Sequence, residues 1–357
     1  MQKAIWQLCL GLVCSAAVLA QNTPPGTRMI ASTVPANGDV NPYGVAIVPT
    51  TVGNLTAGNI LVSNFNNSSN LQGTGTTIVQ ITPGGGRSLF AWINADALPD
   101  SCPGGIGLTT ALAALPSGWV VVGSLPTTDG TAATAQAGCL LLLDPWGNVA
   151  ETIANDWISG PWDMTALQQG GQAFLFVSNV LNGTVAGGGS VVNQGSMIRI
   201  TLDLPSSGAP VVQSITTIGW GFPERTDPAA LVIGPTGLGL ASDGTLYVAD
   251  SLNNRIAAFP NAISTQDPPT TGATVKMGQP LNDPLGLTIG VHGGNIQTVN
   301  GNNGLLAFTT AAGAAVAVAV LDSNGSPKGA RALFGLADSG HGIYYVDDAT
   351  NTLNISQ

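Results

Sequence analysis

Short apolar segments separated by turn residues recur along the chain. The clearest unit, Gly234–Pro260, has an Asp-Gly turn at Asp243 and Gly244 between two apolar strands, and a third strand follows at Arg255–Phe259. An Asp-Gly pair between apolar runs is a strong hairpin signal. The unit therefore predicts a small antiparallel sheet.

The second strand of this unit has six copies, each ending in Asn, Ser or Asp, at residues 58–64, 118–124, 173–179, 244–250, 294–300 and 342–347. A first strand precedes each copy and carries, at one fixed register, Gly44, Gly107, Asp163, Gly237, Gly286 and Gly335. Because glycine allows close approach, these positions predict innermost strands that crowd an axis. Repeats of short strands at this period are typical of β-propeller blades.

The sixth unit lacks a fourth strand, which the other five units have. A missing strand would leave an unpaired edge, and such edges promote aggregation. The segment Arg28–Val34 can supply the strand. We therefore predict an all-β fold, a six-bladed β-propeller closed by an N-terminal strand that completes the last blade. The single domain spans residues 21–357, with blades over 41–93, 104–154, 160–219, 234–278, 283–322 and 329–357 plus 28–34.

The first twenty residues have the features of a signal peptide. Lys3 precedes an apolar stretch, Ile5–Leu19, and small residues flank the expected cleavage site after Ala20. An uncleaved anchor is the alternative, although the stretch is short for a membrane span. We expect a secreted or periplasmic protein with no membrane span after cleavage.

Two cysteines remain in the mature chain, Cys102 and Cys139. An even pair in an exported protein predicts one disulfide. Two buried free thiols are the alternative.

Charged residues are scarce, at 8% of the chain, with 9 Lys+Arg against 19 Asp+Glu and a formal net charge of −10. So few basic residues cannot neutralise a phosphate backbone, which argues against nucleic-acid binding. The sequence pI of about 4.2 is consistent with acidic surroundings. We expect a monomer whose partner is a small molecule or a protein.

The repeated first and second strands resemble the NHL-repeat family of six-bladed propellers, above all in Gly234–Pro260. The chain is also similar to exported bacterial NHL-type proteins, in the stretches Asn41–Asn67 and Gly160–Asn179. The resemblance implies the fold more firmly than a function, because propellers serve in binding, scaffolding and catalysis.

Polar residues at the strand ends form one candidate site. The second strands end on one face of a propeller, around its channel, and this places there Asn64, Asn179, Asp250, Asn300 and Asp347, with Asp163 entering from a first strand beside Trp162. Oxygen ligands of this kind suit Ca²⁺, and Asp163, Asn179 and Asn300 are the candidate ligands. The alternative is that these side chains hydrogen-bond their own turns.

Long loops are expected on the same face, because the second-to-third strand connections of blades 1 to 3 are extended. Such loops on a rigid scaffold commonly bind ligands. The segment entering blade 4 adds candidate ligand-binding residues, namely Trp220, Glu224, Arg225 and Asp227. An ion-paired loop is the alternative for this segment.

The sequence favours a binding or interaction module, with a ligand site at the axial mouth near blades 1 to 3. The alternative is a calcium-dependent, lactonase-like hydrolase, because Asp163 resembles the carboxylate ligand that begins a first strand in lactonase-type propellers. The two histidines, His292 and His341, lie in turns of the opposite face. No Ser-His-Asp order, Cys-His pair or phosphate-binding loop is present in the sequence.

Overall fold

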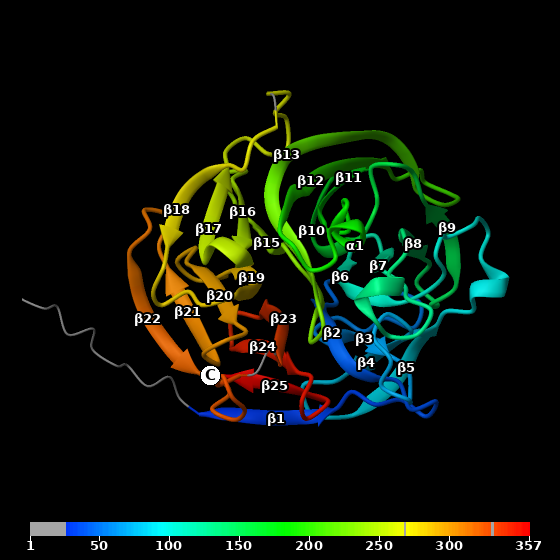
Figure 1. The fold of residues 1–357 in the computed structure, drawn as a ribbon. Coiled ribbons are helices and arrows are strands. Elements are labelled where there is room, and N and C mark those ends of the chain that lie inside the picture. The colour runs from blue at the N-terminus through cyan, green and yellow to red at the C-terminus, as the bar shows by residue number, and fades with distance from the viewer. Residues whose placement is uncertain (1–25, 268, 330–331) are drawn as a thin grey trace, which may run out of the picture.

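A computed structural model describes residues 26–267, 269–329 and 332–357, which form six antiparallel sheets arranged radially about an axis (Figure 1). This arrangement confirms the predicted all-β, six-bladed β-propeller. The predicted signal peptide, residues 1–20, lies outside the described residues. Within the described ranges, no helix is both long and apolar enough to cross a membrane.

Each blade has four strands, numbered from the axis outward. Blades 1 and 2 contain β2 (Val40–Ile47), β3 (Ile60–Asn66), β4 (Thr77–Ile81), β5 (Arg87–Trp92), β6 (Leu108–Ala114), β7 (Val120–Ser124), β8 (Cys139–Leu143) and β9 (Val149–Ile153). Blades 3 and 4 contain β10 (Pro161–Gln169), β11 (Gln172–Asn179), β12 (Val192–Asp203), β13 (Val211–Asp227), β15 (Pro235–Leu240), β16 (Leu246–Asp250), β17 (Arg255–Phe259) and β18 (Ala273–Met277). Blades 5 and 6 contain β19 (Pro284–Ile289), β20 (Ile296–Asn300), β21 (Leu305–Thr309), β22 (Ala315–Val320), β23 (Leu333–Asp338), β24 (Ile343–Asp347), β25 (Thr352–Ser356) and β1 (Thr27–Ser32).

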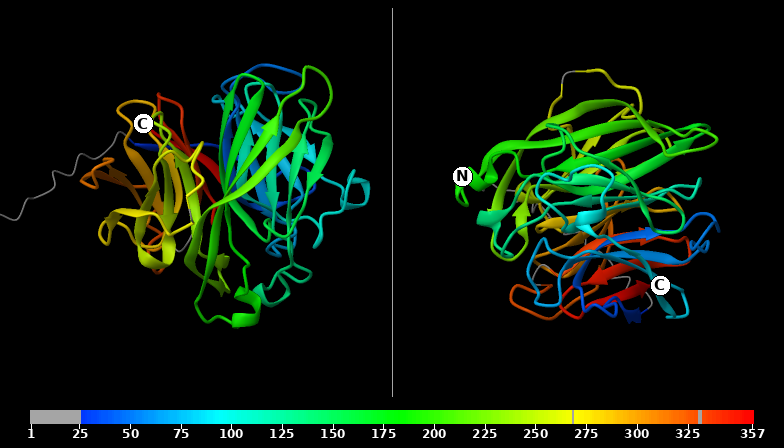
Figure 2. Two further views of the ribbon diagram at one scale, coloured as in Figure 1. Left: turned by 90° about the horizontal axis from the view of Figure 1, so that it is seen from above. Right: turned by 90° about the vertical axis from the view of Figure 1, so that its right-hand side faces the viewer.

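Strand β1 closes the ring. It pairs antiparallel with β25, and Thr27 lies opposite Ser356 while Ser32 lies opposite Thr352. The blue first strand and the red last strand accordingly lie side by side in Figures 1 and 2. The predicted closing segment, Arg28–Val34, overlaps this strand, so the predicted closure is confirmed.

The register glycines allow the innermost strands to touch. A Cβ atom at Gly237, Gly286 or Gly335 would collide with backbone atoms of the next blade's innermost strand. Blade 3 has Asp163 at this position, and its side chain fills the gap. The Asp163 Oδ2 atom accepts a hydrogen bond from Leu238 N of blade 4 at 3.1 Å.

Hydroxyl groups also link neighbouring blades near the axis. Ser63 Oγ donates to Thr109 O of blade 2 at 2.8 Å, and Ser178 Oγ donates to Thr236 O of blade 4 at 2.9 Å. These bonds satisfy carbonyl groups that the free edge of an innermost strand leaves without a ladder partner.

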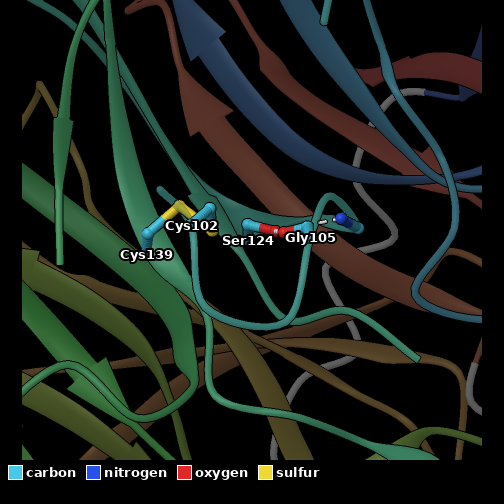
Figure 3. Close-up of a disulfide and its surroundings, with 5 residues drawn as sticks. Cys102, Gly105, Ser124 and Cys139 are labelled. Atoms are coloured by element: carbon cyan, nitrogen blue, oxygen red, sulfur yellow. Dashed lines mark hydrogen bonds between the residues drawn. A yellow bond between two sulfur atoms is a disulfide. The ribbon is translucent and has the colours of Figure 1, made fainter. Parts of the chain in front are cut away.

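A disulfide joins Cys102, in the connection between blades 1 and 2, to Cys139, the first residue of β8. Figure 3 shows it beside the hydrogen bond from Ser124 Oγ to Gly105 O, which measures 2.9 Å. Both cysteines are buried. The disulfide therefore fixes the connecting segment against blade 2.

The longest loops project from one face of the disc, as Figure 2 shows for the green segment that includes α1 (Thr184–Gly187). This loop connects β11 to β12 in blade 3. The corresponding loop of blade 2 contains the short 3₁₀ helix η2 (Ala132–Thr134). We call this side the loop face.

Candidate functional site

Four aromatic side chains fill the axis on the loop face. Tyr43 stacks between Phe65 and Phe334, whose ring centroids lie 4.5 Å and 3.9 Å from its own. The Trp162 ring meets both Tyr43 and Phe65 edge-to-face at 5.7 Å. All four side chains are buried. We call these residues the aromatic plug.

A hairpin from blade 3 covers the aromatic plug. Blade 3 was predicted to end at residue 219, but β13 continues to Asp227 and turns back into β14 (Leu231–Ile233), as the strand running toward the centre of Figure 1 shows. Strand β14 is buried in the same apolar cluster as the plug. Burial of this apolar segment stabilises the extension. The axial mouth predicted as the ligand site is therefore filled by protein side chains.

The tip of this hairpin carries several predicted ligand-binding residues. Arg225 and Asp227 form an ion pair at 2.9 Å, and Asp227 Oδ1 accepts a hydrogen bond from Ala229 N at 2.9 Å. Trp220 is 43% exposed. The ion pair matches the alternative of an ion-paired loop.

The predicted strand-end residues have local partners. Their hydrogen-bond or ion-pair partners are Thr33 and Thr77 for Asn64, Arg255 for Asp250, Pro280 for Asn300 and Thr350 for Asp347. This is the behaviour of Asn and Asp side chains that stabilise nearby turns and strand ends. These four residues do not assemble into one site.

The three predicted calcium ligands differ in their available atoms. Both carboxylate oxygens of Asp163 accept backbone N–H groups, from Met164 at 2.8 Å and Leu238 at 3.1 Å. Asn300 donates to a backbone carbonyl. Asn179 is fully buried, and neither of its polar side-chain atoms has a hydrogen-bond partner among the described residues. In the part of the chain that the structure covers, no group of three or more His, Cys, Asp or Glu side chains could hold a metal ion.

Asn182 connects Asn179 with Glu224. Its Nδ2 atom donates to Asn179 O at 3.3 Å, and its backbone N donates to Glu224 Oε1 at 3.0 Å. Glu224 is fully buried, and its Oε2 atom has no partner within residues 26–267, 269–329 and 332–357. Burial raises the pKa of Glu224 to about 8, so the neutral form predominates at pH 7.

Beneath the aromatic plug, innermost strands of all six blades line an axial channel of about 180 Å³. Asp163 lies at the plugged end of this channel, directly after Trp162 in β10. Burial raises the pKa of Asp163 well above its ordinary value, against the effect of the two backbone hydrogen bonds that it accepts. The carboxyl group thus joins blades 3 and 4.

A polar cavity of about 470 Å³ opens on the loop face beside the hairpin tip. It is lined by the loop after β3, the turn between β24 and β25, the start of β2 and the hairpin tip. The lining residues are Val40, Asn41, Asn66, Ser68, Asn70, Gln72, Ala229, Asp348, Ala349 and Asn351. Since most of them carry amide groups, we call this cavity the amide pocket.

The amide pocket has more hydrogen-bond acceptors than donors can satisfy. Asn66 is 2% exposed, and its Nδ2 atom donates to Asn70 Oδ1 at 2.8 Å. Neither Asn66 Oδ1 nor the buried Gln72 Oε1 atom receives a hydrogen bond from any described residue. Buried polar atoms without partners are uncommon and indicate strain, a water molecule or a ligand.

Asp348 adds a carboxyl group to the pocket wall. Burial, and then repulsion from the neighbouring Asp347, raises the pKa of Asp348 to about 8. Asp322 raises it further, and no Lys, Arg or His lines the pocket. The pocket is therefore rich in oxygen atoms and poor in positive charge.

The structure can now be compared with known proteins. No protein-family model and no curated protein match the chain. Similar solved structures include a luciferin-regenerating enzyme (12% identity, 93% of this chain and 96% of that chain, TM-score 0.56) and a gluconolactonase from Xanthomonas campestris (12% identity, 93% and 96%, TM-score 0.54). The calcium-binding protein regucalcin from Agrobacterium tumefaciens is also similar (12% identity, 92% and 93%, TM-score 0.53).

These comparisons support the class, a six-bladed β-propeller. Within the class, the structural neighbours are proteins of the gluconolactonase, regucalcin and virginiamycin B lyase kind. At such low identities the likeness concerns the fold alone. The resemblance to the NHL-repeat family is not confirmed by a sequence match.

Proposed function

We propose that this protein is a binding module that takes a small polar ligand in the amide pocket. The buried, unsatisfied Oδ1 atom of Asn66 carries this proposal, because a bound ligand would supply the missing donor. The pocket volume of about 470 Å³ lies within the usual range for small-molecule sites. The pocket replaces the axial mouth as the proposed site, since the aromatic plug fills the axis.

A thermal-shift panel tests this proposal. The panel contains diamines, polyols, amino acids, nucleosides and calcium chloride, and we expect at least one organic compound to raise the melting temperature. The variant Ala229→Trp should abolish this shift, because Ala229 is exposed at the pocket wall and a large ring would fill the space. Ala133→Trp, at an exposed position of η2, is the matched control. An equal shift in both variants, or no shift with any organic compound, would refute the proposal.

A second candidate function is calcium-dependent, lactonase-like hydrolysis. It is supported by the unsatisfied oxygens of Asn179 and Glu224, which both contact Asn182. Oxygen donors of this kind fit calcium. The structural neighbours titled as a gluconolactonase and as a calcium-binding protein agree with this candidate.

Removal of metal tests the second candidate. We expect a chelator to lower the melting temperature by several degrees, and added calcium to restore it, because the ion would bind only the folded chain. Hydrolysis of gluconolactone should follow the same dependence, and Asn179→Ala should remove both effects. An unchanged melting temperature together with no hydrolysis would exclude this function.

A further inference from the structure

The amide pocket gathers acceptors from segments that are distant in sequence. Asn66 and Gln72 come from blade 1, whereas Asp348 comes from the turn between β24 and β25 in blade 6. The hairpin tip holds Gln72 in place, since Gln72 Nε2 donates to Pro228 O at 3.1 Å. The side-chain amide donors of Asn66 and Gln72 are thus engaged, while their oxygens face no donor in the described structure.

The charges around the pocket are of one sign. Asp347 and Asp322 act on Asp348, and both raise its pKa by repulsion. The nearby cation, Arg225, is paired with Asp227 on the hairpin. A positively charged ligand would relieve this repulsion, whereas an anionic ligand would increase it.

We propose that the amide pocket binds the primary ammonium group of a small organic amine, with the three N–H donors directed to Asn66 Oδ1, Gln72 Oε1 and the Asp348 carboxylate. An ammonium group has three donors and no acceptor, which matches a pocket whose free groups are acceptors. This inference rests on the proposed function, because it names the ligand class for the same pocket.

Isothermal titration with matched compounds tests the inference. We expect 1,5-diaminopentane to bind at least 10-fold more tightly than 1,5-pentanediol, which has the same length without the charge. Pentyltrimethylammonium has the charge but no N–H donor, and it should also bind at least 10-fold more weakly than the diamine. Comparable affinity of the diol or the quaternary amine would overturn the ammonium assignment.

Variants locate the binding site. Asp348→Asn should weaken diamine binding about 10- to 100-fold, the range expected for loss of a charge-assisted hydrogen bond. Asp347→Asn is the matched control, because its side chain does not line the pocket, and its effect should be under fivefold. Gln72→Met removes a second acceptor at similar size and should weaken binding at least threefold. Unchanged diamine affinity in Asp348→Asn and Gln72→Met would overturn the site.

The failure of this inference is distinct from failure of the proposed function. If another organic compound binds and Ala229→Trp blocks it, the binding module stands and the ammonium assignment is wrong. Calcium binding that Asp348→Asn abolishes, with no binding of the diamine, would likewise overturn the assignment in favour of an inorganic cation. If no organic compound binds at all, both statements fall together.

Discussion

Replacing Glu224 with glutamine should raise the free energy of unfolding at pH 8 by about 4 kcal/mol, measured by urea denaturation in the presence of a chelator. Glu224 is fully buried, and burial raises its pKa from 4.5 to about 8. A carboxyl group with a raised pKa in the folded state stabilises the fold fully below its unfolded pKa. This contribution is lost as the pH rises from 4.5 toward 8, because the unfolded chain ionises first.

The pH profile gives the decisive comparison. At pH 4 the wild type and Glu224→Gln should be nearly equal in stability, and the difference should grow steadily above pH 5. Glu151→Gln, which changes the other glutamate on the outer strand β9, should leave the wild-type profile in place. A wild-type free energy of unfolding that stays constant between pH 5 and 8 would contradict the prediction. Greatest stability in acid would also agree with the acidic surroundings expected from the low pI.

Removing the disulfide should lower the free energy of unfolding by about 4 kcal/mol. Cys102 and Cys139 are 37 positions apart, and their link restricts the unfolded chain over this loop. The double variant Cys102→Ala/Cys139→Ala should therefore unfold at a clearly lower urea concentration than the wild type, followed by circular dichroism.

Reduction of the wild type offers a control for this prediction. Dithiothreitol should lower the stability of the wild type to that of the double variant, and it should have no effect on the variant itself. The expected loss comes from the denatured chain, so the folded spectra should coincide. A double variant within 1 kcal/mol of the oxidised wild type would show that the disulfide contributes little.

The blade architecture could be predicted because its signals are local. Apolar alternation, Asp-Gly turns and the register glycines each lie within a few residues of the strand they define. The extension of β13 could not be predicted in this way, since Gly219, Gly221 and Pro223 are typical of a strand end. That extension depends on pairing with β12 and on burial of β14 against the plug, which are contacts across the ring.

The candidate site shows the same division. The sequence drew attention to Asn and Asp at strand ends, but most of these side chains are used by neighbouring turns and strands. Asn66, Gln72 and Asp348 carried no comparable signal, because ring closure alone brings blades 1 and 6 together. One signal was available, since Tyr43, Trp162 and Phe334 each directly precede a register position, and this regularity could have indicated the aromatic plug.

The pairing of β1 with β25 also orders events during synthesis. Residues 27–32 leave the ribosome early, yet their partner, residues 352–356, is made more than three hundred residues later. Individual blades can form as they emerge, whereas the ring is completed only after translation has passed residue 356. Until then the nascent protein exposes the flank of its last sheet, so the interval before closure is when this protein is most vulnerable to misassembly.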